Sequence, residues 1–165
     1  MGLNVRQSEV HGMSQRGGGV SAHLRLSDEK IASDLIPEGK ADMILAMEPV
    51  ESLRYLQWLN PDGVLITAAE PFINIPNYPA IEKVMTEINK FPRNIAIDAE
   101  KIAEDFGSPK SANMVILGAA SPFINMPVEK LEDAIKTIFK SKGEDVVNVN
   151  LKCFSEGRAF AQKKI

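Results

Sequence analysis

The segment 11–19 (HGMSQRGGG) is the strongest candidate for a ligand site, because three consecutive glycines follow Arg16. Glycines let a backbone approach a ligand closely, their N–H groups can point at an anion, and a guanidinium can bind phosphate or carboxylate. Ser14 and Gln15 add neutral hydrogen-bonding groups. The alternative is a flexible strand connection with a solvated arginine. The segment matches neither the GxGxxG nor the GxxxxGK[ST] pattern of nucleotide-binding proteins.

Five single residues could also take part in chemistry. His11 begins the segment 11–19 and adjoins its glycine-rich part, whereas His23 is expected on the exposed polar face of a strand. Glu48 ends a buried strand, where open α/β sheets place ligand contacts, and it could equally stabilise the N-terminus of the next helix. Asn113 is either a cap-region residue or an interior polar contact, and Cys153 is expected to be an inert packed thiol. No carboxylate or cysteine stands at a recognisable metal-site spacing from the histidines.

The composition excludes several classes of protein. The 165 residues include 19 Lys and Arg against 22 Asp and Glu, and the formal net charge of -3 offers no positive field to nucleic acid or an anionic membrane. A single cysteine excludes an intramolecular disulfide and a thiolate cage for zinc or an iron–sulfur cluster. No apolar run approaches ~20 residues, the length of a membrane-spanning helix. We therefore expect a soluble protein of the reducing cytoplasm.

Strands and helices alternate along the chain, which predicts a three-layer α/β/α fold with a mainly parallel sheet, Rossmann-like in part. The expected strands are 3–10, 20–27, 42–47, 64–67 and 94–98. The expected helices are 49–58, 80–90, 99–106, 112–120, 128–140 and 144–160. The apolar run 42–47 is typical of a strand covered on both faces, and the alternation in 20–27 is typical of a half-exposed strand.

One stretch occurs twice with small changes. Residues 68–76 (AAEPFINIP) resemble residues 119–127 (AASPFINMP). Two such loops could shape one shared groove. Alternatively, proline-bounded exits before helices have converged on similar turn chemistry.

Segment 8–18 (SEVHGMSQRGG) resembles the beta subunit of indolepyruvate:ferredoxin oxidoreductase, which corresponds to the gamma subunit or domain of the 2-oxoacid:ferredoxin oxidoreductases. Three further stretches match in the same order, 41–49 (ADMILAMEP), 112–119 (ANMVILGA) and 150–157 (NLKCFSEG). The resemblance therefore covers nearly the whole chain.

The resemblance implies a division of labour between subunits. In such enzymes a large partner subunit carries thiamine diphosphate, Mg²⁺ and iron–sulfur clusters and decarboxylates an aryl 2-oxoacid. CoA captures the acyl group and electrons pass to ferredoxin. The present chain is then the non-thiamine subunit, inactive alone, with no cofactor or metal of its own and no nucleic-acid or membrane partner. When isolated it can form a homodimer.

The resemblance also assigns site residues, none of them catalytic. It places Ser14, Gln15, Arg16, Gly17 and Gly18 in a loop that faces the partner's active centre on the CoA side. His11, Glu48 and Asn113 take second rank. A guanidinium stays charged, so Arg16 would orient phosphate or carboxylate rather than transfer a proton.

Relatives of this type open with a strand and a GVGGQG-type turn that leads into a helix, and residues 1–165 contain no such turn. We therefore expect one gamma-type domain over 1–165, N-terminally truncated, with an unpaired sheet edge and uncovered apolar surface. Two other functions stay open. One is a stand-alone CoA- or nucleotide-binding module that uses segment 11–19, and the other is a purely structural subunit whose loop contacts only protein.

Overall fold

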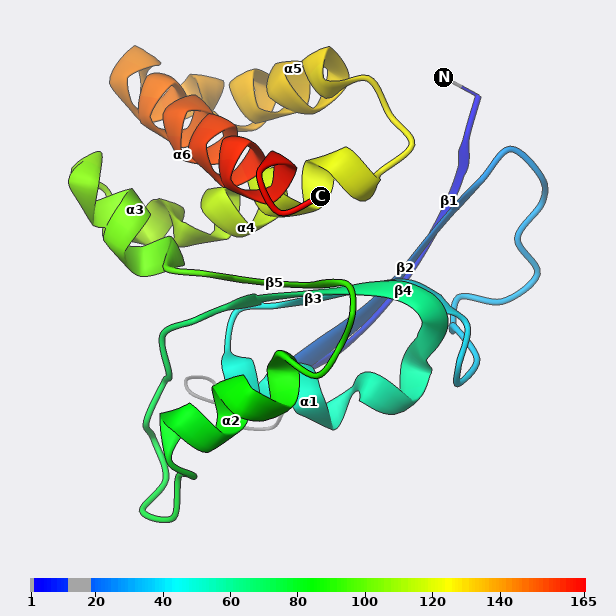
Figure 1. Ribbon diagram of the computed structural model, residues 1–165. Coiled ribbons are helices and arrows are strands. Elements are labelled where there is room, and N and C mark those ends of the chain that lie inside the picture. The colour runs from blue at the N-terminus through cyan, green and yellow to red at the C-terminus, as the bar shows by residue number, and fades with distance from the viewer. Residues whose placement is uncertain (1, 12–18) are drawn as a thin grey trace.

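A computed structural model, which describes residues 2–11 and 19–165, places a parallel sheet between two layers of helices (Figure 1). The sheet has the order β3-β4-β5, with β3 at Ala41–Ala46, β4 at Leu59–Ala68 and β5 at Asn94–Ile97. The helices are α1 (Pro49–Arg54), α2 (Ile81–Ile88), α3 (Ala99–Asp105), α4 (Ala112–Ala120), α5 (Val128–Phe139) and α6 (Glu144–Gln162). Short 3₁₀ turns lie at Leu56–Trp58, Pro109–Ser111, Ser121–Phe123 and Lys140–Lys142. The predicted three-layer arrangement is confirmed.

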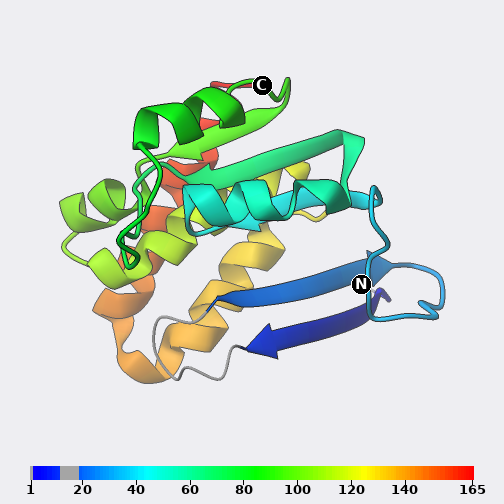
Figure 2. The same cartoon turned by 90° about the horizontal axis from the view of Figure 1, so that it is seen from below.

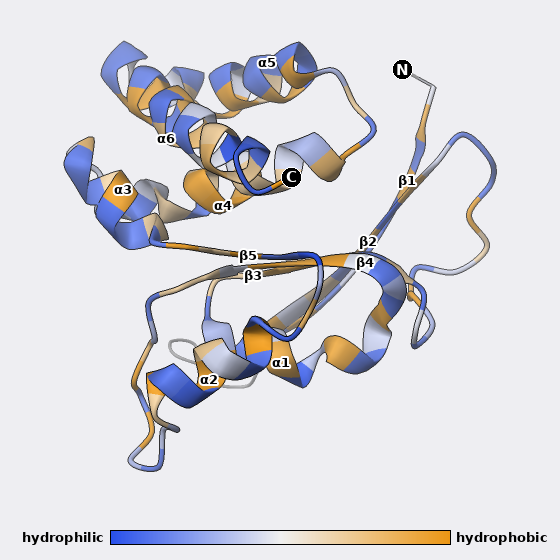
Figure 3. Cartoon of the chain, viewed as in Figure 1, coloured by the Kyte–Doolittle hydropathy of each residue, from blue (hydrophilic) through white to orange (hydrophobic). Residues whose placement is uncertain are grey.

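The core lies on both faces of β4, because successive side chains of a strand point to opposite faces. Val64 and Ile66 pack toward α4 and α6, whereas Leu65 packs toward α1 and α2. Figure 3 shows apolar residues along this strand and on the sides of the helices that face it. Both helix layers are thereby fixed to the central strand. Among the described helices, none has the length and apolar run that a bilayer crossing needs.

Strand β3 corrects one expectation, because it is not covered on both faces. Leu45 is 45% exposed although it lies in the apolar run. Within the described residues β3 pairs only with β4, and the apolar cluster under α4 and α6 is built mainly on β4 and β5. Leu45 is therefore exposed because β3 lies at the edge of the described sheet, and not because the strand is polar.

Helices α4 and α6 cross at two glycines. A Cβ atom on Gly118 would lie well under 3.0 Å from the Phe154 carbonyl oxygen, and one on Gly157 would lie equally close to the Val115 carbonyl oxygen. The two backbones are therefore in direct contact. Cys153 is fully buried in this region, as predicted, and burial raises the pKa of its thiol.

Strands β1 (Asn4–His11) and β2 (Val20–Ser27) form a separate antiparallel hairpin beside the main sheet (Figure 2). Its polar face is the covered one. His23 Nδ1 accepts a hydrogen bond from the Ile36 backbone N–H at 3.0 Å, and the His23 ring stands edge-on to Trp58. Arg25 donates to the carbonyl oxygens of Ser33 and Leu35 at 2.8 and 3.2 Å. The expectation that His23 is exposed is therefore wrong.

The apolar face of the hairpin is open instead. Val5 lies opposite Leu26 across the hairpin, and Val20 and Leu24 are on the same face. Each of these four side chains is at least 44% exposed. The physical reason is local: residues 33–36 offer backbone N–H and carbonyl groups, which need polar partners and draw the polar face inward. A two-stranded hairpin with an open apolar face is prone to pair with another surface.

This face gives a first prediction. Leu24→Thr is expected to weaken self-association of the isolated chain while changing its free energy of unfolding by less than ~0.5 kcal/mol, as for an ordinary surface position. Sedimentation over a concentration series and urea unfolding measure the two quantities. The matched control is Leu65→Thr, which removes a fully buried leucine and should cost about 2–5 kcal/mol. A large loss of stability in Leu24→Thr would show that the face is covered in solution by the chain itself.

Candidate functional site

The carboxyl ends of β3, β4 and β5 lie at one edge of the parallel sheet, which is where open α/β sheets bind ligands (Figure 1). Two glutamates follow the strands there in the same way. Glu48 stands two residues after the end of β3 and Glu70 stands two residues after the end of β4, and a proline follows each of them.

Glu48 caps helix α1. One carboxylate oxygen accepts the Glu51 backbone N–H at 2.8 Å, and the other accepts the hydroxyl of Tyr78. The capping alternative for Glu48 is therefore the one the structure supports. Burial, followed by the hydrogen bond to Glu48, raises the pKa of Tyr78 above its ordinary value, so the tyrosine stays a protonated donor. The pair attaches loop 69–80 to the start of α1.

Glu70 caps helix α3, and it was not among the predicted site residues. Its carboxylate accepts the backbone N–H groups of Ala99, Glu100 and Lys101 at 3.1, 3.0 and 3.4 Å. These are N–H groups of a first helical turn, which have no partner within the helix. The shared Glu-Pro spacing after two apolar strands is the sequence signal that could have found it.

Loop 69–80, which is anchored at Glu70 and at Tyr78, carries an exposed apolar tip. Phe72, Ile73 and Ile75 are 63%, 68% and 46% exposed. In the second copy of the motif, by contrast, Phe123 and Ile124 pack against the core cluster of Val64 and Ile66.

The two copies of the motif lie at opposite ends of the sheet. Arg93, which immediately precedes β5, lies over the Phe123 ring at 5.7 Å from its centroid, whereas loop 69–80 leaves the carboxyl end of β4. The alternative of one shared groove is therefore wrong. The two copies also differ locally, because Ser121–Phe123 forms a 3₁₀ turn whereas residues 71–74 have no regular structure.

The predicted site residues are only partly placed. Ser14, Gln15, Arg16, Gly17 and Gly18 lie outside the described residues. The end of β1 and the start of β2, which flank them, lie on the same side of the molecule as the carboxyl ends of the parallel strands (Figure 2). His11 is exposed and its Nε2 is 3.1 Å from a carboxylate oxygen of Glu9.

Asn113 occupies the first turn of α4 and is exposed. Helix α4 covers the face of the sheet opposite to the one that α1 covers (Figure 1). Asn113 and Glu48 therefore stand at the starts of helices that cover opposite faces of the sheet. The cap-region position predicted for Asn113 is the one observed.

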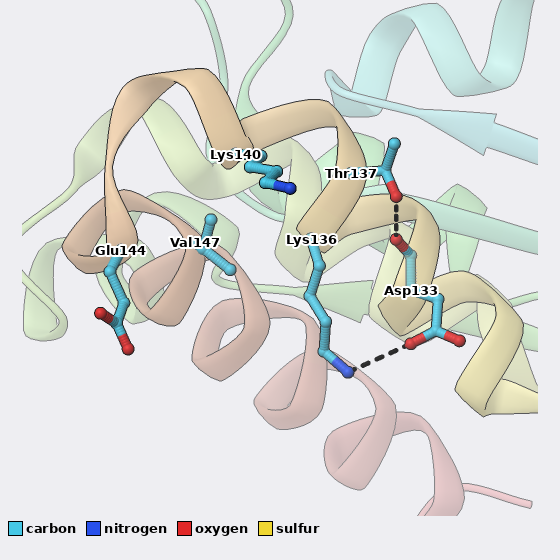
Figure 4. A pocket seen from close by; sticks show the side chains of 6 residues that line it. All are labelled: Asp133, Lys136, Thr137, Lys140, Glu144 and Val147. Carbon is cyan, nitrogen blue, oxygen red and sulfur yellow. Dashed lines mark hydrogen bonds and ion pairs between the residues drawn. The ribbon is translucent and has the colours of Figure 1, made fainter.

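A pocket lies between α5 and α6 (Figure 4). Its lining residues are Asp133, Lys136, Thr137, Lys140, Glu144 and Val147. Lys136 lies 3.2 Å from Asp133 within the same helix, so two of the charges neutralise each other. Among the described residues, no group of three or more His, Cys, Asp or Glu side chains is arranged to hold a metal ion.

The attachment of loop 69–80 leads to a second prediction. Tyr78→Phe removes one donor from the Glu48 carboxylate and is expected to lower the free energy of unfolding by about 1 kcal/mol. The raised pKa means that the folded state retains a proton that the unfolded chain loses above about pH 10. This part of the stability is therefore present below pH ~10, falls as the pH rises further, and is absent from the variant.

Urea unfolding between pH 8 and 11 measures the Tyr78 effect, and limited proteolysis should cut loop 69–80 faster in the variant. Tyr55→Phe is the control, because it alters the other tyrosine of the chain and leaves Glu48 untouched. Equal pH profiles for Tyr78→Phe and the unaltered chain would contradict the assigned hydrogen bond.

The comparison with protein families identifies the class. The family described as pyruvate ferredoxin/flavodoxin oxidoreductase matches residues 1–160, and the chain belongs to this family. The chain is 39% identical to the indolepyruvate oxidoreductase subunit IorB of Archaeoglobus fulgidus, over 94% of this chain and 80% of that protein. The resemblance found in the sequence is thereby confirmed.

Two solved structures share the fold. One is the 2-oxoglutarate:ferredoxin oxidoreductase of Magnetococcus marinus with 2-oxoglutarate, coenzyme A and succinyl-CoA bound (TM-score 0.72, 24% identity, 98% of this chain and 26% of that chain). The other is the gamma subunit of a keto/oxoacid ferredoxin oxidoreductase from Geobacter sulfurreducens PCA (TM-score 0.64, 22% identity, 96% of this chain and 80% of that chain). Both confirm the α/β fold.

Proposed function

We propose that this chain is the non-thiamine subunit of an indolepyruvate:ferredoxin oxidoreductase. The complex converts an aryl 2-oxoacid to its acyl-CoA by CoA-dependent oxidative decarboxylation and passes the electrons to ferredoxin. The observation that carries the proposal is the 39% identity to an indolepyruvate oxidoreductase subunit over nearly the whole chain. The reducing cytoplasm, suggested by the single cysteine, is where we place the complex.

The residues of this chain support a division of labour in which the partner holds the redox groups. An iron–sulfur cluster needs four thiolate ligands as a rule, and the one cysteine of this chain is fully buried. The glutamates at the carboxyl edge are engaged as well, since Glu48 and Glu70 accept hydrogen bonds from helix N-termini. We therefore assign thiamine diphosphate, Mg²⁺ and the clusters to the large subunit.

We assign segment 14–18 to the contact with the partner's active centre. The flanking end of β1 and start of β2 lie on the carboxyl side of the sheet, where α/β folds bind ligands (Figure 2). Arg16 in this segment would orient a phosphate or carboxylate group of CoA or the 2-oxoacid through paired hydrogen bonds. Glu48 acts on this edge through the loop it holds, as a positioning residue.

Co-expression with the cognate thiamine-binding subunit tests the proposal. The two chains should co-purify as a complex of fixed stoichiometry, and the small chain alone should show no turnover of any 2-oxoacid. Failure to co-purify would contradict the proposal. Calorimetry on the isolated chain distinguishes the alternative: tight CoA binding that Arg16→Ala removes would identify a stand-alone CoA-binding module.

A further inference from the structure

We infer that the exposed apolar tip of loop 69–80, formed by Phe72, Ile73 and Ile75, is a docking surface for the large thiamine-binding subunit. This inference rests on the proposed function and specifies which surface of the chain the partner covers. All three side chains are at least 46% exposed, and they lie at the carboxyl edge of the sheet.

The chain itself shows what these side chains pack against when a surface is present. In the second copy of the motif, Phe123 and Ile124 pack on Val64 and Ile66, and the Arg93 guanidinium covers the Phe123 ring. The first copy has nearly the same sequence, Pro-Phe-Ile-Asn followed by one residue and proline. Its apolar residues therefore have the same tendency to be buried, and within the described residues they find no such surface.

The loop is held open rather than free to fold back onto the core. Glu70, which precedes Phe72 by two residues, binds three backbone N–H groups of α3. At the other end Tyr78 donates to Glu48, which in turn caps α1. Two anchors on separate helices keep the apolar tip directed outward. Holding the tip in place before binding reduces the entropy lost when a partner contacts it.

Two observations favour the large subunit over a second copy of this chain. In the Magnetococcus marinus enzyme, 98% of this chain matches only 26% of a much longer chain. The fold there is one part of a larger polypeptide. In addition, loop 69–80 lies on the same side of the molecule as the end of β1 and the start of β2 (Figures 1 and 2). One partner can therefore contact both the tip and the segment that we assign to the active centre.

The experiment compares two isoleucines of equal exposure in the co-expressed complex. Ile73 is 68% exposed on the loop, and Ile138 is 67% exposed on α5. Ile73→Ser should raise the dissociation constant for the large subunit at least about tenfold, the effect of losing one buried aliphatic side chain. Ile138→Ser should change it less than twofold. Both variants should unfold at the same urea concentration as the unaltered chain, because neither side chain is in the core.

The outcomes separate the docking surface from the proposed function. If the unaltered chain binds the large subunit and Ile73→Ser binds equally well, the docking surface is wrong and the proposed function stands. If the unaltered chain does not bind the large subunit, the proposed function is contradicted, whatever the result for Ile73→Ser. If Ile73→Ser changes only the monomer–dimer equilibrium of the isolated chain, a second copy covers the tip and the inference is overturned.

Discussion

Gly157→Ala is expected to destabilise the chain by ~3 kcal/mol or more, or to prevent folding. Overpacking of a tight core contact typically costs about 1–3 kcal/mol, and more where only backbone can move. Here the added Cβ would meet the Val115 carbonyl and Cα at the crossing of α6 with α4. Helix propensity acts in the opposite direction, because alanine is favoured over glycine within a helix by about 0.8–1 kcal/mol. A lower free energy of unfolding for Gly157→Ala would show that the steric clash of the Cβ atom outweighs the gain in helix propensity.

Urea unfolding of the isolated chain measures this change, with two further variants for comparison. Gly118→Ala should be about as damaging, because its Cβ would meet the Phe154 carbonyl oxygen from the other side of the same crossing. Gly2→Ala is the neutral control, since no heavy atom lies within 4 Å of its added Cβ. A stabilised Gly157→Ala chain would mean that the helices are not in backbone contact.

Arg16→Ala is expected to lower kcat/KM of the complex about 10–100-fold without preventing assembly. The basis is the loss of a charge-assisted, two-pronged hydrogen bond to phosphate or carboxylate, which is worth about 1.5–3 kcal/mol. Arg16→Lys keeps the charge and loses the planar guanidinium. The kcat/KM of this variant should therefore lie between the values of the unaltered chain and of Arg16→Ala. Steady-state assays against CoA and the 2-oxoacid in turn show which ligand the arginine orients.

Co-purification provides the control for Arg16. Impaired assembly with an unchanged apparent affinity for CoA would assign the segment a purely structural contact with the partner. Unchanged kinetics in a fully assembled complex would remove Arg16 from the site altogether. Each result leaves the family membership intact and changes only the role of the segment.

Much of the fold follows from periodicity and turn residues. The alternation of apolar strands with amphipathic helices predicts the three layers, and most elements fall close to their expected bounds. Strand β4 is the main exception, because it begins at Leu59 rather than at 64, and helix α1 ends at Arg54 rather than at 58. The apolar run 112–120 is the buried helix α4, for example, and Glu48 occupies the helix N-terminus that the following proline indicated. Local sequence determines the Glu48 cap directly, since its partner, the Glu51 backbone N–H, lies three residues away.

Other features depend on which surface covers a given face, and periodicity does not contain that information. Alternation in β2 separates Leu24 from His23, but the backbone groups of residues 33–36 decide that the histidine side is covered. The two copies of the motif make the same point, because Phe72 is open and Phe123 is packed in nearly identical sequence. The role of Glu70 depends on α3, almost thirty residues further along the chain.

The most direct test of the central claim is the activity of the purified two-subunit complex. The complex should reduce ferredoxin in the presence of an aryl 2-oxoacid such as indolepyruvate, and only when CoA is added. The large subunit alone and this chain alone should each be inactive. A complex that forms but reduces ferredoxin with no 2-oxoacid, or a large subunit that is fully active without this chain, would contradict the claim.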